Sequence, residues 1–171
     1  MKKIKAKVLV VGDAACGKTT LIQMYTTNGQ TFLKDYNMTQ AAEVSSKIIP
    51  FPEKDKDVEL FFFDISGQDC YQSITSELLG QADLLVLVYD CTSQESYNKL
   101  QTWYDKVKQK NSKSLQGVLI STKNDLSGAR QVDPQQARDL AKKLNLQFFE
   151  VSSARNTNID LPFQNLAERL V

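Results

Sequence analysis

The sequence predicts a three-layer α/β fold, in which helices cover both faces of a six-stranded, mostly parallel sheet. Six short runs rich in β-branched or aromatic residues recur along the 171 residues, and segments of helical period separate most of them. The runs are continuously apolar, as in Leu-Leu-Val-Leu-Val-Tyr at 84–89, which is typical of parallel strands buried on both faces. The length of the chain fits a single domain, residues 1–171.

The expected strands follow these apolar runs in order. They cover residues 3–11, 43–50, 57–64, 83–89, 115–121 and 146–151. The first run alternates lysine with apolar residues, which is the period of a strand rather than of a signal peptide. Between the second and third runs, prolines and five consecutive charged residues predict an exposed antiparallel hairpin at the sheet edge.

About five helices are expected. Apolar residues at helical spacing predict helices at 18–27, through Tyr97 and Val107, through Ala137 and Leu144, and through Leu161 and Leu170, with a weaker one at 71–81. Asp133 and Pro134 form a start signal, because aspartate caps helices and proline suits a first turn. These helices complete the three layers.

The composition excludes several classes of function. The chain has no histidine, which excludes a Ser-His-Asp triad, histidine metal ligands and an imidazole base. A net charge of +1 gives no electrostatic support for binding nucleic acid or an anionic membrane. Three cysteines without paired spacing predict neither disulfides nor a zinc site, and favour a reducing, intracellular compartment. The apolar runs are far shorter than the roughly 20 residues of a membrane-spanning helix, so a soluble protein is expected.

A phosphate-binding loop is predicted where the first strand ends. The pattern G-x-x-x-x-G-K-[ST] is matched by Gly12, Asp13, Ala14, Ala15, Cys16, Gly17, Lys18 and Thr19, with Thr20 next in the helix. Backbone N–H groups can turn inward around phosphates, the helix adds its positive N-terminal end, and Lys18 adds a point charge. Thr19 offers a hydroxyl to Mg²⁺. An ordinary strand-to-helix turn would not explain the lysine and threonine at the helix start.

A second candidate ligand-binding segment ends the third expected strand, where ligands meet an open α/β sheet. It reads Asp64-Ile65-Ser66-Gly67-Gln68. Asp64 can hold Mg²⁺ through water, and Gly67 can bring its N–H to a terminal phosphate. The same residue types form plain turns, but behind a phosphate-binding loop the segment favours a site for the metal and the terminal phosphate.

Two further loops predict a site for guanine. Thr122-Lys123-Asn124-Asp125 ends the fifth expected strand and Ser152-Ser153-Ala154 ends the sixth, on the edge of the phosphate-binding loop. The Asp125 carboxylate can accept hydrogen bonds from the N1–H and the exocyclic amine of guanine, whereas adenine presents an acceptor and no amine there. Buried polar groups left unpaired by the wrong base give discrimination of about 10⁴-fold. A solvated turn is the alternative interpretation of this tetrapeptide.

Together, these segments resemble the Ras superfamily of small GTPases over essentially the whole chain. The resemblance implies a P-loop, Ras-like fold that binds GTP or GDP with Mg²⁺ and hydrolyses GTP. It also implies that Thr39 closes on Mg²⁺ and the γ-phosphate, that Gln68 orients the attacking water, and that Lys18 contributes to catalysis. Phe32 is expected either to cover an edge of the base or to anchor its loop on the core.

Residues 89–96 and 150–159 resemble the Rab branch of this superfamily. Within that branch, the chain most resembles the Rab-like GTPase subunits of intraflagellar transport. The resemblance lies at residues 21–25, Gly29, Phe32, Lys34, Tyr36, Thr39 and 58–61. This implies a heterodimer with a β-sandwich partner subunit inside a larger transport complex, located in the cytoplasm, the cilium or flagellum and the basal body. No nucleic-acid partner is expected from the net charge. No direct membrane anchor is expected either, since the sequence ends without a cysteine to prenylate.

The sequence departs from the family pattern at four places. Ala14 replaces a glycine that faces the γ-phosphate, so its methyl group is expected to crowd Gln68 or an incoming arginine finger and to slow hydrolysis. Gln40-Ala41 replaces Ile-Gly, which predicts altered effector recognition. Thr122 replaces the usual asparagine, and its shorter hydroxyl is still expected to tether the loop. Ser153-Ala154 replaces Ala-Lys, which keeps a backbone N–H near the base and loses a covering lysine stem.

Three alternatives remain open. The first is a scaffold that stays filled with nucleotide without turnover, which Ala14 favours and Gln68 and Thr39 disfavour. The second is an ATP-dependent P-loop kinase, which the joint presence of D-x-x-G-Q and T-K-x-D disfavours. The third is a conventional vesicle-trafficking Rab protein whose prenylated tail lies outside this sequence.

Overall fold

The computed structural model describes residues 2–32 and 37–171. Its six strands are β1 (Lys2–Gly12), β2 (Ala42–Phe51), β3 (Lys56–Ile65), β4 (Leu84–Asp90), β5 (Gln116–Thr122) and β6 (Gln147–Glu150). They form one sheet in the order β2-β3-β1-β4-β5-β6. β2 is antiparallel to β3, and all other neighbours are parallel. The six strands, the mostly parallel sheet and the antiparallel edge hairpin are thereby confirmed.

The helices agree with the sequence except at one place. Those described are α1 (Lys18–Thr26), α2 (Gln72–Leu78), α3 (Gln94–Asn98), α4 (Leu100–Lys110), α5 (Pro134–Lys143) and α6 (Leu161–Glu168). The helix expected through Tyr97 and Val107 is divided into α3 and α4, which meet at Lys99, because a ψ of −8° there departs from helical geometry. Asp133 caps α5 as expected, and its carboxylate accepts a hydrogen bond from the Gln135 N–H at 2.7 Å.

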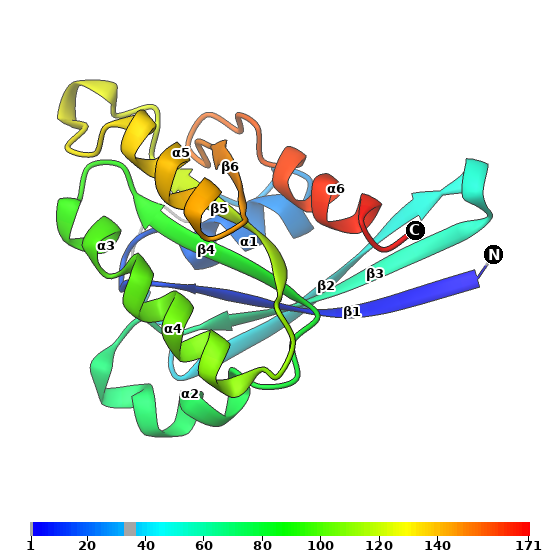
Figure 1. The fold of residues 1–171 in the computed structure, drawn as a ribbon. Helices are drawn as coiled ribbons and strands as arrows, with labels where there is room; N and C mark the ends of the chain where they lie inside the picture. The colour runs from blue at the N-terminus through cyan, green and yellow to red at the C-terminus, as the bar shows by residue number, and fades with distance from the viewer. Residues whose placement is uncertain (1, 33–36) are drawn as a thin grey trace.

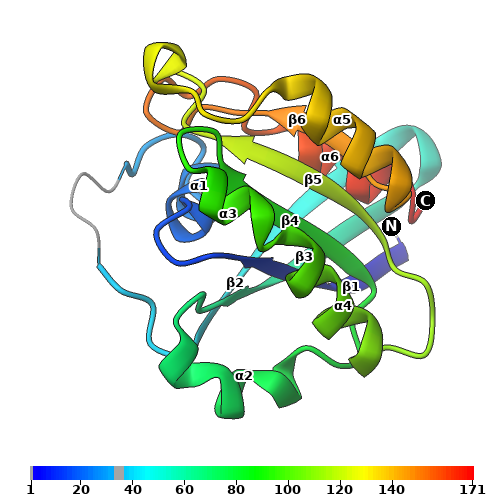
Figure 2. The same cartoon turned by 60° about the vertical axis from the view of Figure 1, so that its left-hand side comes forward.

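Helices cover both faces of the twisted sheet (Figures 1 and 2). On one face, α1 and α6 pack on the strands through Leu21, Tyr25 and Phe163. On the other face, α4 and α5 pack through other buried side chains, among them Trp103. Neighbouring residues of β1 point into different cores, so this central strand is buried on both sides, as its apolar run predicts.

The loops that follow β1, β3, β4, β5 and β6 lie at one edge of the sheet, because parallel strands end at the same edge. At the opposite end, the β2–β3 hairpin and the start of β1 extend beyond the helices (Figure 1). The hairpin turn contains a short 3₁₀ segment, Pro52–Lys54. None of the helices within 2–32 and 37–171 has the length and apolar character needed to cross a membrane.

Candidate functional site

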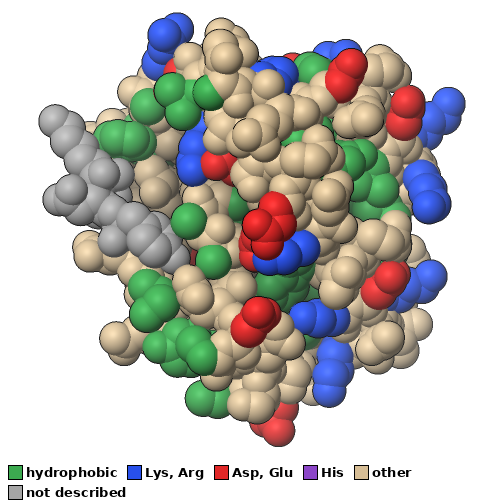
Figure 3. Space-filling model, turned by 90° about the vertical axis from the view of Figure 1, so that its left-hand side faces the viewer, with side chains coloured by type: hydrophobic (Ala, Val, Ile, Leu, Met, Phe, Trp, Pro, Cys, Tyr) green, Lys and Arg blue, Asp and Glu red, His purple; other side chains and the backbone are tan. Residues whose placement is uncertain are grey.

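A cavity of about 360 Å³ opens at the edge where the parallel strands end. Loops that are far apart in sequence line it, through Ala14, Ala15, Gly17, Lys18, Thr19, Thr20, Phe32, Asn37, Thr39, Ser66, Gly67, Thr122, Lys123, Asp125, Leu126, Ser153 and Ala154. Figure 3 faces this edge and shows acidic and basic side chains next to one another near its centre. The structure therefore brings the predicted phosphate, metal and base segments to one place.

The sequence does not predict Asn37, Ser66 and Leu126, which also line the cavity. Each lies within three residues of a predicted one, and that adjacency is the only signal that could have found it. Conversely, within the described chain, six predicted residues stand outside the lining, namely Gly12, Asp13, Cys16, Asp64, Gln68 and Ser152. Most of these six make hydrogen bonds that hold the lining in place.

Side chains hold the carbonyl groups of the phosphate-binding loop. Lys18 Nζ donates to the carbonyl oxygens of Gly12 at 3.0 Å and Asp13 at 2.8 Å. Thr122 Oγ1 donates to the carbonyl of Cys16 at 2.6 Å, so the hydroxyl does tether the loop as expected. Ala15 adopts a φ of 58° and Gly17 a φ of 91°, the left-handed region in which backbone amides form anion-binding concavities.

The helix that follows this loop begins without a cap. Gly17 precedes α1 and provides no side-chain cap, and the first turn contains no acidic residue. The first N–H groups of a helix have no partners within the helix. The positive end of α1 therefore borders the cavity, and no acidic residue of its own first turn neutralises it.

Lys18 is a buried cation at this end of the cavity, with only 6% of its surface exposed. Both carbonyl acceptors of its ammonium group are uncharged, so these contacts orient the charge and do not neutralise it. A buried charge is costly unless it is paired. The arrangement fits an anionic ligand such as a polyphosphate.

Three oxygen-bearing side chains meet beside Lys18. Thr19 Oγ1 lies 2.8 Å from Thr39 Oγ1 and donates a hydrogen bond to Asp64 Oδ2. Asp64 is 2% exposed, and its second oxygen, Oδ1, is buried without a hydrogen-bond partner in the described chain. Burial raises the pKa of Asp64 to about 6.

These oxygens suit Mg²⁺, which prefers oxygen ligands and keeps several waters. The unpartnered Asp64 Oδ1 supports a Mg²⁺ site here, because a cation nearby would compensate the buried carboxylate. Within the described ranges, no cluster of three or more acidic or cysteine side chains could hold a metal by itself.

Gly67 touches the phosphate-binding loop so closely that a side chain cannot fit. A Cβ atom at this position would lie 2.3 Å from the Ala14 nitrogen and 2.4 Å from the Asp13 carbonyl carbon. Backbone atoms cannot yield as a flexible side chain can. The segment after β3 therefore packs directly on the loop after β1.

Gly67→Ala is expected to lower the free energy of unfolding by about 1–3 kcal/mol, because one of the two loops must move. The matched control is Gly128→Ala, where a Cβ would meet nothing within 4 Å. Urea unfolding followed by circular dichroism measures both. Equal unfolding midpoints for the two variants would contradict the close packing of Gly67.

The two loops predicted to bind the base, residues 122–125 after β5 (the base loop) and residues 152–154 after β6, are joined by a short hydrogen bond. Ser152 Oγ donates to Asp125 Oδ1 at 2.6 Å and accepts from the Arg155 N–H at 3.1 Å. Asn124 Nδ2 donates to the carbonyl of Val151 at 2.9 Å. The loops after β5 and β6 are thus fixed to each other, and Asp125 lines the cavity with its remaining oxygen available.

Charged residues outside the motifs support both the loop after β5 and the phosphate-binding loop. Arg130 Nη2 donates to Asn124 Oδ1 at 2.6 Å and to Glu150 Oε1 at 2.9 Å. In the phosphate-binding loop, the Asp13 carboxylate accepts from Lys99 Nζ at 3.1 and 3.2 Å. A carboxylate so near a phosphate site would repel the ligand, and Lys99 compensates it. No motif in the sequence points to Arg130 or Lys99.

The segment that contains Phe32 and Thr39 and the segment that contains Gln68 differ in how they meet the cavity. Thr39 is buried, with 9% of its surface exposed. Phe32 lines the cavity and is 41% exposed, so its position favours a role in covering the base over a role in anchoring its loop on the core. Gln68 is half buried and its N–H donates to Ser66 Oγ at 3.3 Å. Lys34 and Tyr36, which carry part of the family resemblance, lie outside the described residues.

A mostly parallel α/β sheet whose first strand leads through G-x-x-x-x-G-K-T into a helix defines the P-loop class of nucleotide-binding proteins. The model of the Ras family matches residues 7–171, and the chain therefore belongs to the Ras family.

Curated relatives agree with this assignment. The intraflagellar transport protein 27 homolog of Mus musculus is 38% identical over 170 residues, which cover 99% of this chain and 91% of the relative. Intraflagellar transport protein 27 of Chlamydomonas reinhardtii is 36% identical over 96% of this chain and 83% of its own. Ras-related protein Rab-3 of Caenorhabditis elegans is 34% identical over 95% of this chain and 72% of its own.

Proposed function

We propose that this protein binds GTP and GDP with Mg²⁺, hydrolyses GTP slowly, and acts as a nucleotide-regulated subunit of intraflagellar transport. One observation carries the proposal. A single cavity is lined both by the phosphate-binding loop with Lys18 and by Asp125, which matches the polyphosphate and the base of one nucleotide. The sequence segments for both are the ones that characterise guanine-nucleotide proteins of this family.

Each group in the cavity has a role in this proposal. Lys18 and the N–H groups at the start of α1 bind phosphate oxygens. Thr19, Thr39 and Asp64 would hold Mg²⁺, which neutralises charge on the phosphates during phosphoryl transfer. Asp125, held by Ser152, binds the guanine edge.

Gln68 is proposed to orient the attacking water. Ala14 lines the cavity and its backbone nitrogen lies against Gly67, so the residue that replaces the family's glycine is next to the segment that carries Gln68. This position supports slow hydrolysis, because a small misplacement of the water costs a large part of the rate.

A scaffold that binds nucleotide without turnover is the second candidate. It is favoured by one observation, that Gln68 stands outside the cavity lining of the described chain. If Gln68 is catalytic, Gln68→Leu will lower the single-turnover rate of GTP hydrolysis by about tenfold or more while GTP affinity is retained. Gln131→Leu serves as the control, because the Gln131 side chain accepts from the Gln94 N–H and does not line the cavity. Identical rates in the wild type and Gln68→Leu would support the scaffold.

The role in transport rests on the relatives. Relatives named for intraflagellar transport match nearly the whole chain, and a Rab relative matches it at lower identity. We therefore place the protein in the cilium or flagellum, as part of a heterodimer with a β-sandwich partner subunit. Affinity purification of the tagged protein from ciliated cells tests this placement, and recovery of vesicle-trafficking proteins without ciliary transport subunits would contradict it.

A further inference from the structure

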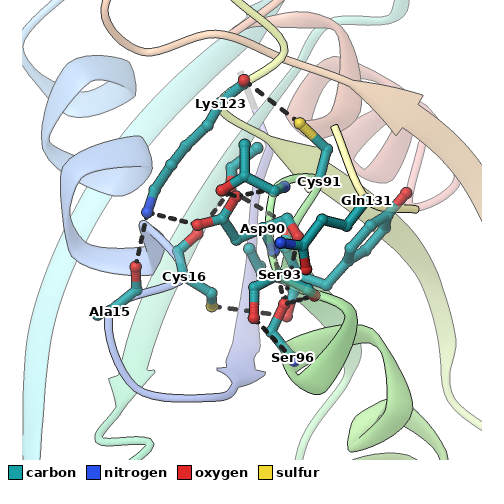
Figure 4. A network of polar contacts seen from close by, with 12 residues as sticks. Ala15, Cys16, Asp90, Cys91, Ser93, Ser96, Lys123 and Gln131 are labelled. Atoms are coloured by element: carbon teal, nitrogen blue, oxygen red, sulfur yellow. Dashed lines mark hydrogen bonds and ion pairs between the residues drawn. The ribbon is translucent and has the colours of Figure 1, made fainter. Parts of the chain in front are cut away.

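A group of polar contacts lies behind the cavity, where β4 ends (Figure 4). Asp90 is the last residue of β4, and its side chain is only 8% exposed. Its Oδ1 accepts hydrogen bonds from the Thr92 N–H at 2.8 Å and from the Thr92 hydroxyl at 2.7 Å. Its Oδ2 lies 2.5 Å from Lys123 Nζ. The carboxylate is thus fixed on one side by Thr92 and presents its charge to Lys123 on the other.

Lys123 makes a second contact, with the phosphate-binding loop. Its Nζ donates to the carbonyl of Ala15 at 3.1 Å, and Figure 4 shows the side chain extended from its own loop toward both Ala15 and Asp90. Ala15 has a φ of 58°, which is unfavourable for a residue with a side chain. Lys123 therefore holds a carbonyl whose orientation the backbone alone would not maintain.

We propose that Asp90 is a positioning residue that slows nucleotide release, because it keeps Lys123 extended between the base loop and the phosphate-binding loop. The Lys123 side chain is 39% exposed and long, so without a fixed partner it would sample many rotamers. With Asp90 in place, Lys123 joins the loop after β5 to the phosphate-binding loop, and it also lines the cavity. The inference rests on the proposed function and concerns how the same cavity keeps its ligand.

The charge of Asp90 can be separated from its role in the local turn. The Ser96 hydroxyl accepts from the Asp90 N–H at 3.1 Å and donates to the Ser93 carbonyl at 2.9 Å, so the backbone of this connection has support of its own. Asp90→Asn keeps an oxygen for Thr92, whose N–H requires an acceptor. The amide nitrogen must then face Lys123, where it cannot accept a hydrogen bond from the ammonium group.

The experiment measures the release of a fluorescent GDP analogue from the full chain in Mg²⁺, after addition of excess GDP. We expect Asp90→Asn to accelerate release roughly tenfold, as the loss of a charge-assisted hydrogen bond predicts. Lys123→Met should accelerate release at least as much. The double variant should match Lys123→Met alone, because Asp90 acts through Lys123. Asp105→Asn, which removes the same charge from an exposed position on α4, is expected to leave release unchanged.

Two results would overturn the proposal: unchanged release from Asp90→Asn, or an Asp90→Asn effect that persists in full in the Lys123→Met background. If Asp90→Asn does not fold, Thr92→Val replaces it, since it removes only the hydroxyl that fixes Oδ1, and a two- to threefold acceleration is expected. No acceleration from Thr92→Val would then also count against the proposal. Failure of the wild type to bind the analogue would contradict the proposed function itself.

Discussion

Lys18→Ala is expected to abolish useful affinity for GDP and GTP. The ammonium group is buried at the phosphate end of the cavity, and its contacts with two carbonyl oxygens aim its charge without neutralising it. Truncating one partner of a buried charge pair costs about 2–5 kcal/mol, so the affinity should fall roughly 30- to 4,000-fold. Isothermal titration with GDP in the presence of Mg²⁺ measures the change.

Lys142→Ala is the matched control for this variant, because it removes the same charge from an exposed position near the end of α5. It should titrate as the wild type does. Circular dichroism checks that Lys18→Ala remains folded, since the substitution also removes the donor to Gly12 and Asp13. Equal affinities of folded Lys18→Ala and the wild type would remove Lys18 from its proposed role.

Asp125→Asn is expected to invert the choice of base. The carboxylate accepts from the two donors on the guanine edge, whereas an asparagine amide offers one acceptor and one donor group. The substituted side chain would keep the acceptor that Ser152 uses and turn its amide nitrogen to the base. Xanthine carries a carbonyl oxygen where guanine carries the amine, so it complements this amide.

Competition titrations with GDP and xanthosine diphosphate test the inversion. The preference for guanine, about 10⁴-fold in sites of this kind, should reverse in Asp125→Asn, so that xanthosine diphosphate binds this variant better than GDP does and better than it binds the wild type. Asp105→Asn should keep the original preference. A variant that still prefers guanine to the same degree would show that Asp125 does not read the base.

Much of the fold follows from local sequence patterns. The apolar strands and the capped helix at Asp133 appear as predicted, because buried parallel strands and cap residues leave strong local signals. The division at Lys99 does not, because the helical periodicity of Tyr97, Leu100, Tyr104 and Val107 continues across a break in backbone geometry. Side-chain spacing reports the buried face of a helix and does not report the hydrogen bonds of its backbone.

The site shows the same division between local and long-range information. Lys18, Gly67 and Asp125 belong to short motifs with a chemical meaning, and the structure brings all three to one cavity. Asp90 and Lys99 could not be found this way, because each contacts a motif residue in a distant segment, Lys123 and Asp13 respectively. Asp90 lies 33 positions before Lys123 in the chain, and only the pairing of β4 with β5 brings the two together.

The central claim is that one cavity holds both the polyphosphate and the guanine of a single nucleotide. The most direct test has two steps. A fresh preparation is denatured and the released nucleotide is identified by chromatography. Any empty protein is then titrated with GDP and ADP in Mg²⁺. The structure predicts bound GDP or GTP, and binding of added GDP in preference to ADP. A preparation that contains no nucleotide and does not bind guanosine polyphosphates, or one that retains adenine nucleotide, would contradict it.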